Sequence, residues 1–317
     1  MYTKPLKVYQ FKFPIITFLL TIIAITLYYW MNQYTQDADG IDSDTWALFG
    51  APSAIDIYGG QFWGVITNSF LHENTYHLLF NMIGLILFGT YLEQRISHFH
   101  FFIFGLLASF ITSSVQLALT DDAGLGMTGV NYAFFGYLLL RSPKDNHALV
   151  VAKQILFFLM TALVIYFIVA NNYFGGNFGF ESIASGFLWG TVFGLYFKNT
   201  LKAITGSLLL VTLSLSFIGL FYNPWSSDYN CKKGITYHDR NQYAKASYYY
   251  KKALAINPKN SVANKNLILI EIDELSALAY KAHISNNFVQ AKRYYLRILT
   301  LDKSNEWART NFNSLPE

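Results

Sequence analysis

Seven apolar runs dominate the first 222 residues of this 317-residue chain, and each is close to the length that crosses a lipid bilayer. A transmembrane α-helix needs about 20 consecutive, mostly apolar residues. The runs therefore predict an all-α fold, a polytopic helix bundle with about seven transmembrane helices embedded in the bilayer. We expect the helices at residues 14–31, 77–92, 100–119, 127–140, 153–170, 182–197 and 207–221.

Basic residues alternate between the loops of this region. They occur in the N-terminal tail and after the second, fourth and sixth runs, whereas the loops after the first, third and fifth runs carry none. Because Lys and Arg concentrate in cytoplasmic loops, the N-terminus is predicted to be cytoplasmic. Seven spans then place the C-terminal part outside. The first run lacks a small-residue cleavage site, so we interpret it as an uncleaved span.

Charge divides the chain into two parts. The sequence has 9 Lys and Arg against 11 Asp and Glu before Asp228, and 14 against 8 from there on. We therefore expect a basic tail at 1–13, a membrane domain at 14–222 and a soluble helical domain at 228–315. The positive charge of the soluble part is too scattered to indicate nucleic-acid binding. The single cysteine, Cys231, excludes a disulfide framework, and no cofactor is expected.

The C-terminal part carries a repeat. Small and aromatic residues fall at the positions of a 34-residue tetratricopeptide unit, in the order Gly234, Tyr237, Ala246, Tyr250, Ala253 and Pro258. A second copy begins 45 residues on, with Phe288, Ala291, Tyr295 and Leu301. We expect the extra 11 or so residues, beyond the usual 34, to lengthen the linker between the copies. A generic helical hairpin is the alternative. Such repeats present grooves for peptides, so a protein partner is expected here.

Three polar side chains stand at the outer ends of the predicted spans. Thr128 lies between Gly126 and Gly129, and His77 and Asn81 are four residues apart, so they share one helix face. Polar groups inside a membrane face the bundle interior or water. The three could share one outward-opening pocket in which His and Asn donate to an oxyanion. Alternatively, His77 and Asn81 only hydrogen-bond between helices.

The segments around these residues resemble the rhomboid family of intramembrane serine proteases. They are Trp63-Gly-Val-Ile-Thr-Asn-Ser-Phe-Leu-His72, His77-Leu-Leu-Phe-Asn81, Gly-Thr-Tyr-Leu-Glu93-Gln-Arg95 and Gly126-Met-Thr-Gly-Val-Asn-Tyr132, in order and over about residues 60–197. The resemblance implies a rhomboid-like fold in a bacterial plasma membrane. It also implies cleavage of transmembrane segments by a Ser–His dyad.

The resemblance assigns roles to individual positions. His77 and Asn81 fall on the oxyanion-hole pair, Thr128 on the nucleophile, and Tyr132 on the aromatic residue that stacks on the catalytic His. Gly186 and Gly190 fall on the glycines of close helix packing. They continue to Gly194 as a stripe of small residues, which favours close approach of two membrane helices.

Two positions depart from the family pattern. Thr128 replaces the nucleophilic Ser, and its methyl group restricts χ1. Ile183 stands where the family has its catalytic His, and the sixth run contains no His. General-base catalysis contributes about 10²–10⁴ in rate. A third, lesser departure is Gly64, where the family often has Arg.

These observations leave three functions open. The first is a pseudoprotease that engages transmembrane segments or membrane-tethered substrates and binds a protein partner through its repeats. The second is an active intramembrane serine-type endopeptidase with an altered nucleophile and an unrecognised base. His77 could reach Thr128 as a substitute base, but only by leaving its oxyanion role. The third is a membrane anchor for the repeat domain.

Overall fold

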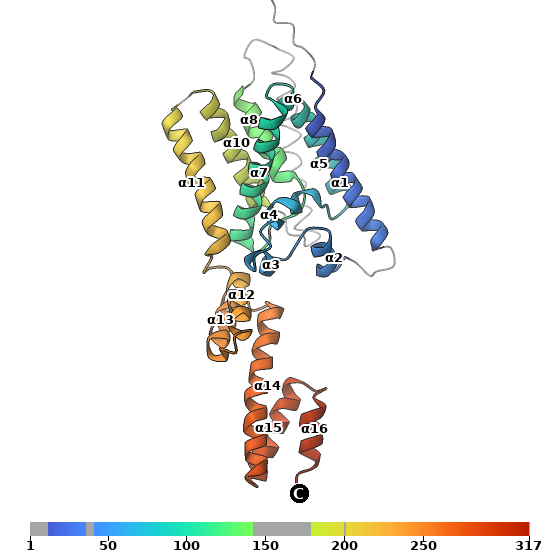
Figure 1. Ribbon diagram of the computed structural model, residues 1–317, viewed down its shortest axis with the longest axis vertical. Helices are drawn as coiled ribbons and strands as arrows, with labels where there is room; N and C mark the ends of the chain where they lie inside the picture. The colour runs from blue at the N-terminus through green and yellow to red at the C-terminus, as the bar shows by residue number, and fades with distance from the viewer. Residues whose placement is uncertain (1–11, 36–40, 142–178, 200, 317) are drawn as a thin grey trace, which may run out of the picture. The chain divides into compact units, whose positions relative to one another are not determined.

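The computed structural model describes residues 12–35, 41–141, 179–199 and 201–316, which form two compact units divided after Asn223. The regular elements among these residues are all helices (Figure 1). Unit 1 contains α1 (Ile15–Tyr34), α2 (Ser43–Leu48), α3 (Ala54–Tyr58), α4 (Gly64–Thr67), the 3₁₀ turn η1 (Asn68–Phe70), α5 (Thr75–Gly84), the π-helical turn η2 (Leu85–Gly89), α6 (Thr90–Glu93), α7 (His98–Thr120), α8 (Thr128–Arg141), α10 (Phe180–Phe197) and α11 (Lys202–Phe221). Unit 2 contains α12 (Ser227–His238), α13 (Tyr243–Ile256), α14 (Ser261–Ile284), α15 (Phe288–Leu301) and α16 (Glu306–Asn313).

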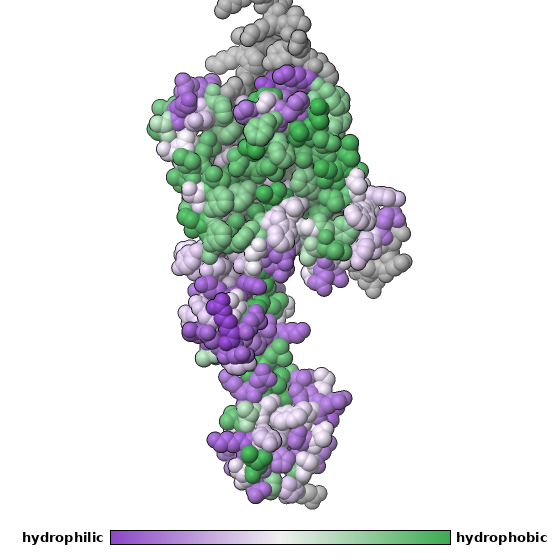
Figure 2. Space-filling view, viewed as in Figure 1, coloured by the Kyte–Doolittle hydropathy of each residue, from purple (hydrophilic) through white to green (hydrophobic). Residues whose placement is uncertain are grey.

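Six of the seven predicted spans coincide with helices of unit 1, and the span expected at 153–170 lies outside the described residues. Four segments are long and apolar enough to cross a membrane, namely Ile15–Tyr34, Thr75–Glu93, His98–Thr120 and Lys202–Phe221. On the face drawn in Figure 2, an apolar band crosses the middle of unit 1 and polar residues lie at its ends. Unit 1 is therefore an integral membrane domain.

The core of unit 1 forms around α7. This helix packs against α1, α4, α8, α10 and α11, and its Phe101, Phe104 and Ala108 are fully buried. The Phe104 ring stacks on the rings of Trp189 and Phe193 of α10. The site residues at the start of α8 are thus held on a rigid aromatic core.

Glycines bring α8 and α10 into direct backbone contact, as the stripe of small residues predicts. Gly186 lies against the carbonyl oxygen of Gly129, and Gly190 lies against that of Ala133. A Cβ atom at either glycine would overlap this oxygen. Residue numbers increase in the same direction along both helices from one contact to the next, so α8 and α10 are parallel.

A buried carboxylate joins the start of α1 to the end of α6. Glu93 is fully buried and accepts hydrogen bonds from the backbone N–H groups of Ile16 and Thr17, both at 2.8 Å, and from the Thr17 hydroxyl at 2.7 Å. His98 Nδ1 lies 2.6 Å from the same carboxylate. Glu93 therefore caps α1 and stabilises its positive end. It also brings Lys12 and Arg95 to one end of the bundle.

Unit 2 begins with the predicted repeat. Ala246, Tyr250 and Ala253 of α13 are fully buried against α12. The Tyr250 ring packs directly on Gly234 of α12. A Cβ atom added at Gly234 would lie 2.5 Å from this ring, so the contact requires glycine. The second copy follows the same pattern, with Ala291 and Tyr295 of α15 fully buried against α14.

The predicted longer linker between the copies is wrong. The extra residues extend a helix instead, because α14 has 24 residues and α12 has 12. Eleven residues complete three helical turns, so the insertion returns the apolar face to the same direction. The segment 261–284 contains no Gly or Pro to interrupt the helix. Its first half packs on α13 and its second half on α15.

Candidate functional site

The turn before α8 is shaped by a glycine. Gly126 has φ +80°, a conformation that L side chains rarely adopt, and a Cβ atom here would lie 2.7 Å from His77 Nε2. Its N–H donates to the carbonyl oxygen of Asn68, at 3.0 Å. The turn therefore brings Thr128 against α5 and ties it to η1.

The structure brings three of the predicted site residues together. Thr128 Oγ1 donates to Asn81 Oδ1 at 3.1 Å and lies 3.4 Å from His77 Nε2. Asn81 is buried, with 4% of its surface exposed. Thr128 and Asn81 thus form a close polar pair within an apolar bundle.

Asn131 completes this polar cluster and was missed by the sequence argument. Its Nδ2 donates to the backbone oxygen of Asn81 at 3.0 Å and to Asn81 Oδ1 at 3.2 Å. A signal was present, because Asn131 lies one turn after Thr128 on an otherwise apolar helix, and such residues share a face.

These hydrogen bonds determine which way the Asn81 amide faces. Asn81 Nδ2 donates to the carbonyl oxygen of His77 at 3.0 Å, while Oδ1 accepts from Thr128 and Asn131. Reversing the amide would set its oxygen against a carbonyl and its N–H₂ against a donor, so the network selects this orientation. Asn81 therefore presents an acceptor to Thr128, whereas an oxyanion hole requires a donor.

His72 lies beside this cluster and is a second residue that the sequence argument did not single out. Its ring is fully buried, and its centroid is 5.1 Å from that of His77 in a T-shaped arrangement. Within the described ranges, no hydrogen bond joins the rings of His72 and His77. His72 thus packs behind His77 without orienting it by a hydrogen bond.

The two remaining predicted positions belong to the apolar core. Tyr132 is 6% exposed and meets Phe135 edge to face, and Ile183 is also 6% exposed. Ile183 lies one turn before Gly186, so it stands beside the first turn of α8. The only acidic or basic side chain of α10 is Glu181.

The arrangement supplies a hydroxyl but few of the groups that would activate it. Thr128 donates its one proton to an amide oxygen, and the position at which a base would be expected is an aliphatic side chain. Within the described part of the chain, no three His, Cys, Asp or Glu side chains gather closely enough to hold a metal ion.

Comparison with known proteins identifies a family for each unit. Residues 59–200 match the rhomboid domain family, and residues 227–260 match the tetratricopeptide repeat. The chain is similar to the rhomboid protease GlpG of Haemophilus influenzae, with 26% identity over 191 residues, which is 59% of this chain and 95% of that protein.

Proposed function

The chain contains a rhomboid domain followed by a tetratricopeptide repeat, and from this premise we propose that it is a pseudoprotease that engages transmembrane segments. The observation that carries the proposal is Ile183 in the core beside the first turn of α8, where the family has its catalytic His. Without a general base, a Thr hydroxyl is a weak nucleophile. The intact turn and bundle still offer a surface for a membrane helix.

The hydrogen bonds of Thr128 add support. A hydroxyl has one proton, and the 3.1 Å contact to Asn81 Oδ1 uses it. His77 Nε2, at 3.4 Å, can then serve Thr128 only as a donor and not as a base. The Asn81 oxygen would also face, and so repel, an oxyanion that formed at this site.

The test is a cleavage assay. We expect the full chain, reconstituted in lipid vesicles with a helix-destabilised transmembrane substrate, to leave that substrate intact, and we expect the same of the Thr128→Ala variant. Cleavage by the unchanged chain that disappears in Thr128→Ala would overturn the proposal.

A second candidate function is an active intramembrane endopeptidase with Thr128 as its nucleophile. One observation favours it, the 3.4 Å separation between Thr128 Oγ1 and His77 Nε2, which a small shift would close to a hydrogen bond. In this case His77→Ala would abolish cleavage together with Thr128→Ala. The same assay therefore separates the two functions.

We further propose that α14 binds a protein partner. Five of its exposed residues form a stripe at alternating spacings of seven and four, which keeps them on one helix face; the apolar or aromatic ones are Val262, Leu269, Tyr280 and Ile284, and Asp273 lies among them. Tyr280 and Ile284 are 58% and 63% exposed. An exposed, mostly apolar stripe of this length fits the apolar face of a partner's helix. A pure membrane anchor would have no need for it.

The orientation proposed is a cytoplasmic N-terminus in a bacterial plasma membrane, with the repeats outside. Four basic residues support it by their positions at one end of unit 1: Lys12, Arg95, Lys198 and Lys202. Unit 1 ends at the opposite end, where Asn223 Nδ2 donates to the Tyr58 hydroxyl at 2.9 Å.

One experiment tests both the orientation and the partner. We expect a membrane-impermeant, amine-reactive cross-linker added to intact cells to modify the exposed lysines Lys259, Lys265 and Lys281 and to link them to another protein. Lys198 and Lys202 are the internal control and should react only after permeabilisation. Reaction at Lys198 without permeabilisation contradicts the orientation. Modification of unit 2 without linked proteins contradicts the partner.

Cysteine labelling is unsuitable as a test of the orientation, because burial raises the pKa of Cys231 to about 12.

A further inference from the structure

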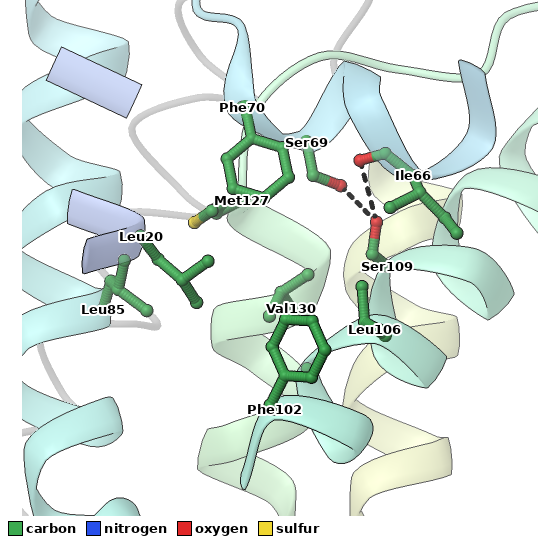
Figure 3. A pocket seen from close by; sticks show the side chains of 11 residues that line it. Leu20, Ile66, Ser69, Phe70, Leu85, Phe102, Leu106, Ser109, Met127 and Val130 are labelled. Carbon is green, nitrogen blue, oxygen red and sulfur yellow. Dashed lines mark hydrogen bonds between the residues drawn. The ribbon is translucent and has the colours of Figure 1, made fainter. Parts of the chain in front are cut away.

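An apolar pocket opens between α1 and α7, below η1 (Figure 3). Leu20 of α1, Phe70 of η1, Phe102 and Leu106 of α7, and Met127 before α8 line it. The space open to the centre of a water-sized sphere is about 30 Å³. This exceeds the roughly 10–15 Å³ that one water molecule needs, so the pocket can take the slender end of an elongated molecule but not a whole ligand.

The pocket offers a ligand almost no hydrogen bonds. Its two polar side chains, Ser69 and Ser109, bond to each other at 2.7 Å, and the Ser109 hydroxyl also lies 3.3 Å from the Ile66 carbonyl oxygen (Figure 3). A water molecule needs about two to four polar partners to be held in a cavity. The lining therefore selects hydrocarbon over water or a polar ligand.

The depth of the pocket in the bilayer indicates which hydrocarbon can reach it. Ser109 is the twelfth of the 23 residues of α7, which places it about 17 Å from the helix start at 1.5 Å per residue. That is near the middle of a bilayer core about 30 Å thick. Beside the lining residues, Leu19 and Ile103 are 49% and 37% exposed, so the surface around the opening faces lipid chains.

We propose that this pocket binds the acyl chain of a membrane lipid. The chain end lies against Met127, which is 3% exposed and directly precedes Thr128. The residue before the pocket-lining Ser69 is Asn68, whose carbonyl oxygen accepts the Gly126 N–H. A bound acyl chain thus contacts both segments that hold the Gly126 turn and links lipid packing to the position of the Thr128 hydroxyl.

The test uses vesicles that contain only this full-length chain and phosphatidylcholine, with a fraction of the lipid bearing a diazirine at the end of one acyl chain. After illumination and digestion, we expect adducts on Met127 and Val130, which are buried, as well as on Leu210, which is 67% exposed on α11. Adducts on Leu210 with none on Met127 or Val130 would overturn the proposal, because a lipid reaches these two residues only through the pocket.

A variant whose own side chain fills the pocket tests whether the lipid enters there. A Cβ atom at Gly105 has only an ordinary contact of 3.6 Å with Phe134, so Gly105→Leu fits the helix and occupies the pocket. It should abolish the Met127 adduct and leave the Leu210 adduct unchanged. Gly219→Leu on α11, with a similar 3.6 Å contact to Ala118, should leave both adducts unchanged. If an apolar transmembrane peptide added to the vesicles displaces the Met127 adduct alone, the pocket holds a protein side chain instead.

Discussion

Replacing Thr128 by Ser and Ile183 by His together is expected to produce cleavage of a transmembrane substrate. The double variant should cleave at least about 10²-fold faster than Thr128→Ser alone, the lower range of what a general base contributes. The reason is geometric. Ile183 stands one turn before Gly186, and Gly186 lies against Gly129 on the first turn of α8. An imidazole at position 183 would therefore stand beside the new serine.

The single variants are the controls, and the measurement is product formation from a helix-destabilised transmembrane substrate in vesicles. Neither Thr128→Ser nor Ile183→His should exceed background, because a hydroxyl and its base act as a unit. The thermal unfolding midpoint of each variant shows whether the buried His is tolerated. A folded double variant that still fails to cleave would contradict the prediction. It would place the remaining defect at Asn81, whose oxygen faces the hydroxyl.

Much of unit 1 could be predicted because membrane helices are recognisable in a sequence as long apolar runs. The sequence spacing also placed His77 and Asn81 on one face and brought Thr128 toward them, and the structure joins them within 3.4 Å. The direction of the Asn81 amide could not be predicted. It depends on the His77 carbonyl and on Asn131, two partners that no short motif contains.

Unit 2 illustrates a different limit. Buried positions such as Tyr250 and Tyr295 recur 45 residues apart, so the repeat was visible in the sequence. The structure of the inserted residues was not visible. The buried positions of the second copy can be recognised whether the 11 extra residues form a loop or three further turns of helix. The absence of Gly and Pro from 261–284 was the one signal that favoured the continuous helix α14.

A single methyl group at Gly190 is expected to destabilise unit 1 more than any conservative change on the lipid-facing helices. In Gly190→Ala, the Cβ atom would overlap the carbonyl oxygen of Ala133, which is backbone and has no rotamer to change. Parallel helices α8 and α10 must then separate, and the aromatic packing of Phe104 on Trp189 and Phe193 loosens with them. Overpacking of this kind costs about 1–3 kcal/mol, and occasionally more.

The matched control has the opposite expected sign, which makes the comparison sharp. At Gly219 of α11 an added Cβ atom meets Ala118 at 3.6 Å, an ordinary contact. Gly219→Ala should therefore stabilise the protein by up to about 1 kcal/mol, because Ala loses less backbone entropy than Gly in a helix. Unfolding in detergent micelles, followed by tryptophan fluorescence, should give a lower midpoint for Gly190→Ala and an equal or higher one for Gly219→Ala. Equal midpoints for the two variants would show that α8 and α10 do not depend on backbone contact. The position of Ile183 beside Thr128 rests on that contact, so the same result would also remove the geometric basis for the double variant.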